Sequence, residues 1–327
     1  MRLILAPMQG VVDHHLRDLL TRLGGLDGCV TEFIRVTDHC LPPKVFLRLC
    51  PELAQGAVTT SGTPVKVQLL GSNPQALAAN ALKAAELGAT AIDLNFGCPA
   101  KTVNNHCGGA KLLNDPPLIE KIVYAVRSAL PESVSLSAKI RLGYESRNAY
   151  LAAARAVENG GAEELVIHAR SKTDGYRPPA YWHLIAEIRA NTQLALVANG
   201  EVWSPEDWQR CREMSLVPDV MLGRGILARP DLALAIKSYA QGKIHQPMSW
   251  YQTCQLLHQY HQSTKHHYPV KYLGNRVKQW LAYLRVYYPE ADQFLESTKR
   301  CRDDSVLEKA FAHELAAHHP PLTVMEA

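Results

Sequence analysis

The amino-acid sequence predicts an α/β protein, a (β/α)8 TIM barrel followed by a smaller all-helical C-terminal domain. Short β-rich runs alternate with segments of helical periodicity over about 240 residues, a pattern typical of parallel strands joined by helices. Eight such runs favour a closed barrel, because a barrel of this kind takes about 250 residues. From about Gly242 onward the alternation stops, and the remaining segments are helical. We therefore expect a barrel domain at residues 1–243 and a helical domain at residues 244–327.

The predicted strands bring polar groups to one rim of the barrel. Most of the runs end beside a polar residue or a glycine, and in such barrels the active site lies at the carboxyl ends of the strands. We therefore expect the strand ends to form the functional site. The strands are Leu3 to Ala6, Cys29 to Ile34, Val65 to Leu70, Ala91 to Asn95, Val134 to Ile140, Glu164 to His168, Leu194 to Ala198 and Asp219 to Leu222.

The helical segments have recognisable start and stop signals. Ser204 before Pro205 marks one start, because a capping hydroxyl precedes a proline of the first turn. Glycine or proline follows other segments where the helical spacing ends. The clearest predicted helices are Pro74 to Leu87, Pro116 to Leu130 and Asn148 to Glu158 in the barrel, and Ser249 to His267, Val270 to Tyr287 and Asp304 to His318 after it.

Composition indicates a globular protein of a reducing compartment. The chain has 327 residues, 47% of them hydrophobic, and a formal net charge of only +4, so overall charge alone does not indicate a nucleic-acid partner. Its eight cysteines include no Cys-x-x-Cys pair, which argues against zinc, iron-sulfur clusters and a disulfide framework, and we expect no metal site. No run approaches the roughly 20 apolar residues of a membrane span. Pro7 and Gln9 follow the apolar start too soon for the core of a signal peptide, so we expect none. We expect a cytoplasmic protein.

The most informative motif is a Gly-Cys-Pro turn directly after a strand. The run that ends at Asn95 is followed by Gly97, Cys98 and Pro99. Such a turn presents a side chain at the barrel rim. A thiol of ordinary pKa, about 8.5, is mostly protonated near neutral pH and can donate a proton as well as act as a nucleophile. The alternative is that Cys98 is a small apolar residue packed at a strand end.

Lys139 lies in a strand whose alternation turns its side chain into the barrel mouth, together with that of Arg141. A lysine in a barrel interior needs an anionic or strongly accepting partner, because an unpaired buried charge is costly. One candidate partner is an internal carboxylate, either Glu201 or Asp93. The other is the electron-rich edge of a flavin.

Glycines after the last two strands indicate a phosphate site. Gly223 and Arg224 follow the eighth strand, and Gly200 follows the seventh. In such barrels these loops often hold a phosphate, and glycine lets backbone N–H groups approach it. The alternative is a loop that needs glycine only for a positive φ angle. His168, at the end of the sixth strand, is either a structural hydrogen-bonding residue or part of the same rim.

The segment from Lys265 to Arg285 is basic and rich in aromatic residues. It contains five Lys or Arg residues and no acid, and Tyr272, Arg276 and Trp280 follow each other at helical spacing. Basic residues interleaved with aromatics suit contacts to phosphates together with stacking on bases. The alternative is a solvated helix whose aromatic residues pack on the core.

Taken together, these motifs resemble the tRNA-dihydrouridine synthases, and within that family the bacterial C type, which acts on uridine 16 of the D-loop. The resemblance runs nearly from end to end. It is carried by Ala6-Pro7-Met8, Val67-Gln68-Leu69, the family-specific Asp93-Leu94-Asn95-x-Gly97-Cys98-Pro99, Lys139-Ile140-Arg141, His168-Ala169-Arg170, Asn199-Gly200-Glu201, Gly223-Arg224-Gly225 and Arg276-Val277-Lys278-Gln279-Trp280.

The resemblance implies bound FMN, reduced by NADPH, and a reaction in which hydride goes to C6 of uracil and Cys98 protonates C5. It implies a flavin site made of Pro7, Met8, Gln68, Lys139, His168, Asn199, Gly200, Glu201, Gly223 and Arg224. It also implies tRNA contacts by Arg35, Asn95, Tyr176, Arg276, Lys278 and Tyr283. We expect a monomer with no obligate protein partner.

The sequence departs from the family at Cys107, where members usually have glycine; this places a second thiol in the loop after Cys98. Two other functions compete with the one implied. An FMN barrel that reduces a small molecule, as dihydroorotate dehydrogenase and old yellow enzyme relatives do, leaves the basic tail unexplained. An RNA-binding module without chemistry leaves Cys98, Lys139 and Arg224 unexplained.

Overall fold

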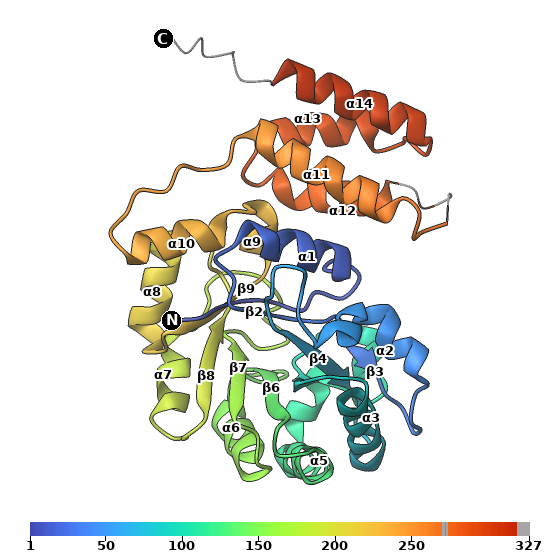
Figure 1. Cartoon of the computed structure of the whole chain (residues 1–327). Helices are drawn as coiled ribbons and strands as arrows, with labels where there is room; N and C mark the ends of the chain where they lie inside the picture. The colour runs from blue at the N-terminus through green and yellow to red at the C-terminus, as the bar shows by residue number, and fades with distance from the viewer. Residues whose placement is uncertain (270–271, 273, 319–327) are drawn as a thin grey trace. The chain divides into compact units, whose positions relative to one another are not determined.

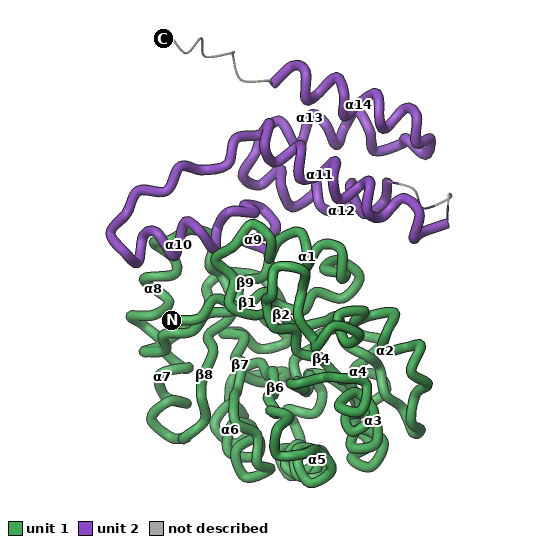
Figure 2. The backbone as a smooth tube through the Cα atoms, viewed as in Figure 1, with its two compact units in different colours: residues 1–223 green, residues 224–327 purple. Residues whose placement is uncertain are grey.

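The structure, a computed structural model, describes residues 1–269, 272 and 274–318 (Figure 1). The chain forms two compact units, Met1–Gly223 and Arg224–Ala327 (Figure 2). This division falls directly after the last barrel strand. The domain boundary expected from the sequence lies two helices further along the chain, where the alternation of strands and helices stops.

The first unit is a closed parallel barrel, which confirms the predicted fold. All strand pairs are parallel, in the order β2-β1-β9-β8-β7-β6-β5-β4-β3, and β2 pairs with both β1 and β4, which closes the sheet. Because β2 and β3 both pair with β4, they act together as one interrupted strand of the barrel. The described strands are β1 Leu3–Leu5, β2 Gly28–Val30, β3 Ile34–Arg35, β4 Val65–Leu70, β5 Ala91–Phe96, β6 Ser135–Arg141, β7 Glu164–His168, β8 Ala195–Asn199 and β9 Asp219–Leu222.

Helices surround the barrel and begin at the signals seen in the sequence (Figure 1). The Ser204 side chain accepts a hydrogen bond from the backbone N–H of Asp207 at the start of α8, and Pro205 occupies the first turn, as predicted. Asn73 caps α3 and Asp115 caps α5 in the same way. These helices are α1 His14–Leu23, α2 Pro43–Leu49, α3 Pro74–Glu86, α4 Lys101–Asn104, α5 Pro116–Ala129, α6 Tyr150–Asn159, α7 His183–Arg189 and α8 Pro205–Ser215, with short 3-10 helices η1 Pro51–Gln55 and η2 Gly109–Asn114.

The second unit is helical in every element that the structure describes. It comprises α9 Arg224–Ala228, α10 Leu232–Ala240, α11 Trp250–Thr264, α12 Asn275–Leu284, α13 Pro289–Thr298 and α14 Asp304–Ala317. The predicted helix from Val270 to Tyr287 is confirmed over α12, while its first residue, Val270, lies outside the described residues. Helix α13 was missed; Pro289 occupies its first turn and Glu290 follows, but no capping hydroxyl precedes the proline as Ser204 precedes Pro205. Along the described chain, no helix has both the length and the apolar character needed to cross a bilayer.

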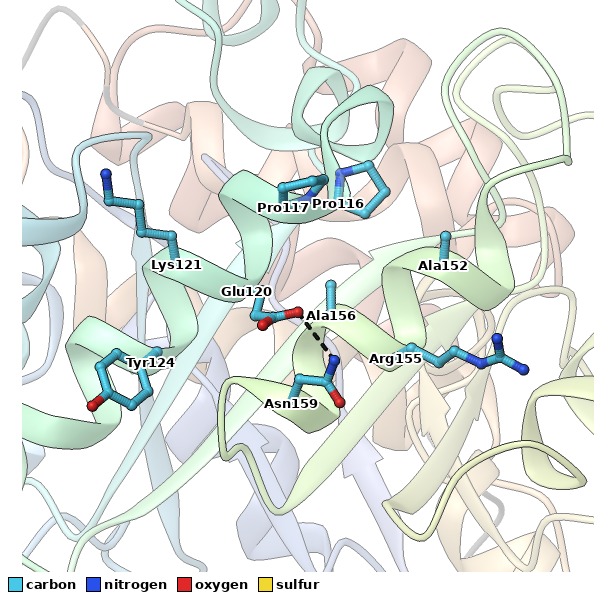
Figure 3. Close-up of a pocket in the computed structure, with 9 residues that line it drawn as sticks. All are labelled: Pro116, Pro117, Glu120, Lys121, Tyr124, Ala152, Arg155, Ala156 and Asn159. Carbon is cyan, nitrogen blue, oxygen red and sulfur yellow. Dashed lines mark hydrogen bonds between the residues drawn. The ribbon is translucent and has the colours of Figure 1, made fainter.

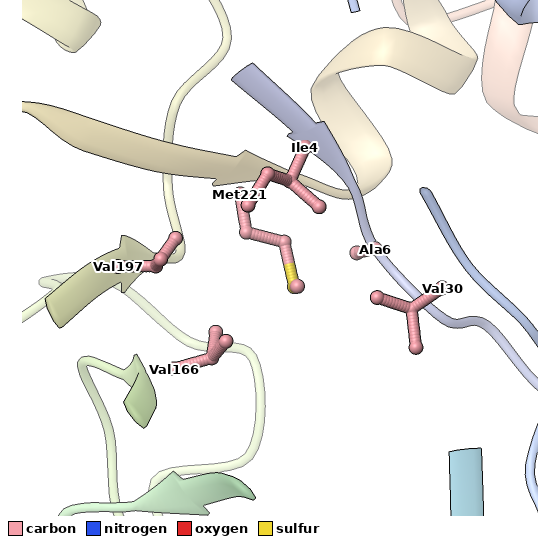
Figure 4. Close-up of a cluster of buried hydrophobic side chains, with 6 residues drawn as sticks. All are labelled: Ile4, Ala6, Val30, Val166, Val197 and Met221. Atoms are coloured by element: carbon pink, nitrogen blue, oxygen red, sulfur yellow. The ribbon is translucent and has the colours of Figure 1, made fainter. Parts of the chain in front are cut away.

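One half of the barrel interior is apolar. It is filled by side chains from five neighbouring strands, β2, β1, β9, β8 and β7, and from the residue after β1: Ile4, Ala6, Val30, Val166, Val197 and Met221 (Figure 4). The other half, along β4 to β6, is polar and contains Lys66, Gln68, Asp93 and Ser137. At the amino ends of the strands, Glu164 accepts from Lys66 at 2.7 Å and from Arg2 at 2.7 Å. These ion pairs occupy one end of the barrel interior and leave the carboxyl ends for the site.

Candidate active site

Cys98 sits on a turn that four hydrogen bonds hold in place. The backbone N–H groups of Gly97 and Cys98 donate to Oδ1 of Asn95, at 3.0 and 2.8 Å. The carbonyl oxygen of Cys98 accepts from the backbone N–H of Ala110 at 3.0 Å and from Nδ2 of Asn104 at 3.2 Å. The backbone that carries the thiol is therefore fixed directly after β5, at the rim of the barrel.

The environment of Cys98 keeps its thiol protonated near neutral pH. Burial raises the pKa of Cys98 above its ordinary value, while a backbone hydrogen bond from Ala100 and the charge of Arg141 act in the opposite direction. Unlike four other cysteines, Cys98 is only partly buried, so the packed-core alternative does not describe it. The fully buried cysteines are Cys29, Cys50, Cys211 and Cys254. The arrangement suits a proton donor.

Lys139 projects from β6 and donates from Nζ to Oδ1 of Asn199, at 2.8 Å. Nδ2 of Asn199 donates in turn to the carbonyl of Met221 at 2.8 Å, which fixes the direction of the Asn199 amide. Burial, assisted by the nearby charge of Arg141, lowers the pKa of Lys139 to about 7. Among the described residues Lys139 has no ion pair. Of the two carboxylates considered as its partner, Glu201 pairs with Arg170, and Asp93 accepts hydrogen bonds from Gln68 and Ser137 and acts on Lys139 only through its charge, which raises the pKa of Lys139. An electron-rich ligand beside Nζ would therefore stabilise the cationic form of Lys139.

Arg141 joins the Cys98 turn to the loop after β7. Its guanidinium donates to the carbonyl of Gly97 at 2.9 Å and to the carbonyls of Ser171 and Gly175 at 3.0 Å each. It also lies 5.3 Å from the ring centroid of Tyr176. The sequence motif included Arg141 but gave it no role. The only sequence signal was its alternation with Lys139, because the partners of Arg141 are backbone atoms far away in the chain.

His168 and Tyr176 lie on the same side of the rim. Their rings meet edge to face, with centroids 5.9 Å apart. Gly200 lies against His168, because a Cβ atom added to Gly200 would stand 3.5 Å from Nε2 of that histidine, and φ of Gly200 is +116°. His168, Tyr176 and the loop after β8 therefore come together, as expected for a shared site.

The loop after β9 lies close to residues near the start of the chain. A Cβ atom added to Gly223 would stand 3.8 Å from Cβ of Ala6 and 4.0 Å from Sδ of Met8, so these residues border one space. Arg224 follows Gly223 directly in the chain and begins α9 in the second unit. Glu201 pairs with the fully buried Arg170 and therefore has a structural partner.

The residues expected to contact tRNA are divided between the two units. In the first, Arg35 and Tyr176 are exposed, whereas Asn95 is buried and both ends of its amide are engaged. In the second, the guanidinium of Arg276 lies 4.9 Å from the ring centroid of Tyr268, and Lys278 donates to the carbonyl of Cys301. Tyr283 lies on the same helix and is partly buried.

Trp280 in the basic segment is a core residue. It is 1% exposed, and its Nε1 donates to the carbonyl of Leu227 at 3.0 Å. Its ring meets that of Tyr260 edge to face, with centroids 5.5 Å apart. For Trp280 the alternative of core packing is therefore correct, while Tyr272, on the same segment, is exposed.

Cys107 adopts a backbone conformation that favours glycine. Its φ is +54°, and its side chain is exposed. Cys107→Gly is expected to raise the free energy of unfolding by up to about 1 kcal/mol, because a side chain in the left-handed region is strained. Urea denaturation checks this. Asn105→Gly is the matched control, since φ of Asn105 is −64° and glycine there should cost about 0.5 to 1 kcal/mol. Equal destabilisation by both changes would contradict the assignment of strain to Cys107.

Two other features lie away from the barrel rim. A surface groove is lined by residues of α5 and α6, among them Tyr124 and Arg155, and by no strand residue (Figure 3). In the second unit, His261, Asp304 and Glu308 have ligand atoms close together. Nζ of Lys265 lies 3.6 Å from Asp304 and 3.4 Å from Glu308, so a lysine already balances these carboxylates.

Known proteins are similar to this chain over nearly its whole length. Residues 4–318 match the family model described as "Dihydrouridine synthase (Dus)". A tRNA-dihydrouridine(16) synthase of Pseudomonas putida is 51% identical over 291 residues, which cover 89% of this chain and 90% of the relative. Another protein of the same name, from Shewanella oneidensis, is 47% identical over 319 residues, covering 98% of this chain and 99% of the relative.

Among solved structures, histamine dehydrogenase from Rhizobium sp. 4-9 shares the fold. The TM-score is 0.55 at 13% sequence identity, over 79% of this chain. The match spans 48% of the length of that enzyme. At this identity the similarity concerns the barrel architecture alone.

Proposed function

The chain belongs to the dihydrouridine synthase family, and from that premise we propose that it reduces uridine to 5,6-dihydrouridine in the D-loop of tRNA, at position 16. The observation that carries the proposal is the position of the Cys98 thiol, held on a fixed turn at the barrel rim next to the strand that bears Lys139. The relatives share the name tRNA-dihydrouridine(16) synthase, which supports position 16. We infer that the protein acts as a monomer in the cytoplasm.

The residues at the rim fit an FMN cofactor. Lys139 has no ion-pair partner among the described residues, and an electron-rich ligand would stabilise its cationic form, which burial disfavours by lowering the pKa to about 7. Gly200 lies against His168 and Gly223 lies near Met8, and we propose that these two loops, with Arg224, would hold the phosphate. Pro7, Asn199 and Glu201 complete the proposed site. Gln68, also expected there, is fully buried, and both ends of its amide bind protein groups. A bound FMN, reduced by NADPH, would supply the hydride for C6 of the uracil.

Cys98 supplies the other hydrogen. The thiol donates its proton to C5 of the uracil, so that one hydride and one proton saturate the double bond, and solvent later reprotonates the thiolate. Arg141 stabilises the thiolate left behind, because its positive charge lowers the pKa of Cys98. A loop nucleotide suits this reaction, since the base must leave its stack to reach the site.

We propose that the helical domain at residues 244–327 binds tRNA through Arg276, Lys278 and Tyr283, and that the barrel contributes Arg35, Asn95 and Tyr176. Arg276→Ala is expected to weaken tRNA binding and to reduce the slope of log K against log salt by about 1, because one phosphate contact is lost. Filter binding at several salt concentrations measures this slope.

Arg285→Ala is the matched control for Arg276→Ala. Arg285 follows the same helix, but its guanidinium lies 3.3 Å from the carboxylate of Asp292. Removal of Arg285 should therefore change the slope of log K against log salt less than removal of Arg276 does. Equal slopes for the two variants would refute the assignment of a phosphate contact to Arg276.

The activity is tested in a strain that lacks this protein. Its tRNA should carry uridine at position 16, and expression of the chain should restore dihydrouridine there, as primer extension or mass mapping reports. Restoration at position 17 or 20 would refute the proposed position but not the activity. If no position were restored, the proposed activity itself would be wrong.

A further inference from the structure

A buried chain of hydrogen bonds runs from the middle of the barrel to the Cys98 turn. Ser137 Oγ donates to Asp93 Oδ1 at 2.7 Å, and Gln68 Nε2 donates to Asp93 Oδ2 at 2.7 Å. Asn95 Nδ2 then donates to Gln68 Oε1 at 2.8 Å. Asp93 and Ser137 are 1% exposed, Gln68 is 0% exposed and Asn95 is 8% exposed. Water therefore has little access to these bonds.

This chain of hydrogen bonds has a single direction. An amide offers a donor at one end and an acceptor at the other, so the neighbour of each end decides which way it lies. Because Asp93 presents an acceptor, Gln68 must turn its NH2 group towards it and its oxygen towards Asn95. Asn95 must then keep its own oxygen for the backbone of Cys98.

We propose that Asp93 and Ser137 are positioning residues for Cys98, acting through Gln68 and Asn95. The catalytic consequence rests on the proposed function, because it assumes that Cys98 is the proton donor. Neither positioning residue needs to approach the substrate. If Gln68 reversed, its NH2 group would face the NH2 group of Asn95. Asn95 would then lose either its bond to Gln68 or its two bonds to the turn that fixes the direction of the thiol.

Because of Ser137, a single substitution at position 93 or 137 leaves the direction of the hydrogen bonds unchanged. Its hydroxyl can either donate or accept, so an amide at position 93 can turn its NH2 group to Ser137 and keep its oxygen for Gln68. A carboxylate at position 93 remains an acceptor for Gln68 even without the hydroxyl. When both features are lost, the direction of the chain of hydrogen bonds rests on the two backbone N–H groups of the Cys98 turn alone.

A double-mutant cycle tests this prediction. The four proteins are the wild type, Asp93→Asn, Ser137→Ala and the double variant, all nearly unchanged in shape. Alkylation of Cys98 by iodoacetamide is followed by peptide mass spectrometry as a function of pH. In each single variant, the rate of alkylation of Cys98 should lie within about twofold of the wild-type rate. The double variant should react roughly tenfold faster near pH 7.5, because a released thiol returns towards its ordinary pKa.

Alkylation of Cys107 in the same samples shows whether a change is local, since that thiol is exposed in the wild type. Thermal unfolding checks that all four proteins fold. Additive effects of the two changes, or an effect of Asp93→Asn alone as large as that of the double variant, would overturn the proposal. A coupled effect on alkylation in a protein whose wild type does not reduce tRNA would leave the positioning intact and refute the proposed function instead.

Discussion

Cys98→Ala is expected to slow the reduction of tRNA uridine by a factor of about 10² to 10⁴, the range typical of a lost general acid. The thiol is the protonated group that the turn after β5 holds at the barrel rim. Reduction of the flavin by NADPH should be unaffected, because no proton from Cys98 is needed in that half-reaction. Stopped-flow measurement of each half-reaction separates the two effects.

Cys107→Ser is the matched control, because it removes the exposed thiol of the same loop. It should retain the wild-type rate of uridine reduction. If activity were lost in Cys107→Ser and kept in Cys98→Ala, the proton donor would be Cys107, and the role of the turn would have been misassigned.

Lys139→Met is expected to weaken FMN binding by about tenfold to a hundredfold, the effect of one lost charge-assisted hydrogen bond. It should also change the pH dependence of binding. The pKa of Lys139 in the flavin-free protein is about 7, so the cation predominates below that pH and is lost above it. Between pH 7 and 9, affinity for FMN should therefore fall as pH rises, by up to about tenfold per unit. In Lys139→Met this decline should be absent.

Fluorescence titration of FMN at several pH values measures both effects. Lys66→Met is the control for loss of a lysine from the barrel interior, because Lys66 pairs with Glu164 at the opposite end of the strands. It should keep the affinity and the pH dependence of the wild type. A decline with pH that persists in Lys139→Met would mean that another group causes it.

Much of the fold could be predicted because the determining signals are local. Apolar runs marked the strands, and pairs such as Ser204 and Pro205 marked helix starts. The split of the second run into β2 and β3 could not be predicted, since it depends on which residues pair with β4. Helix α13 could have been predicted from Pro289, and the division of the chain after Gly223 could not.

The site was predictable only in part, for a physical reason. Motifs located Cys98 and Lys139 because their neighbours in sequence restrict where they point. The contacts of Arg141 with the carbonyls of Ser171 and Gly175 depend on tertiary structure, and so does the direction of the amide of Gln68 between Asp93 and Asn95. Hydrogen-bond direction is set by the whole chain of partners, which no single segment reveals.

The central claim is that Cys98 and a reduced flavin together saturate one uracil in tRNA. The most direct measurement mixes the anaerobically reduced, flavin-loaded protein with an equal amount of tRNA that lacks dihydrouridine, then digests the RNA for mass spectrometry. We expect one dihydrouridine, at position 16, for each flavin oxidised. A flavin that stays reduced while tRNA is bound, or that is oxidised equally well by free uridine, would contradict the claim.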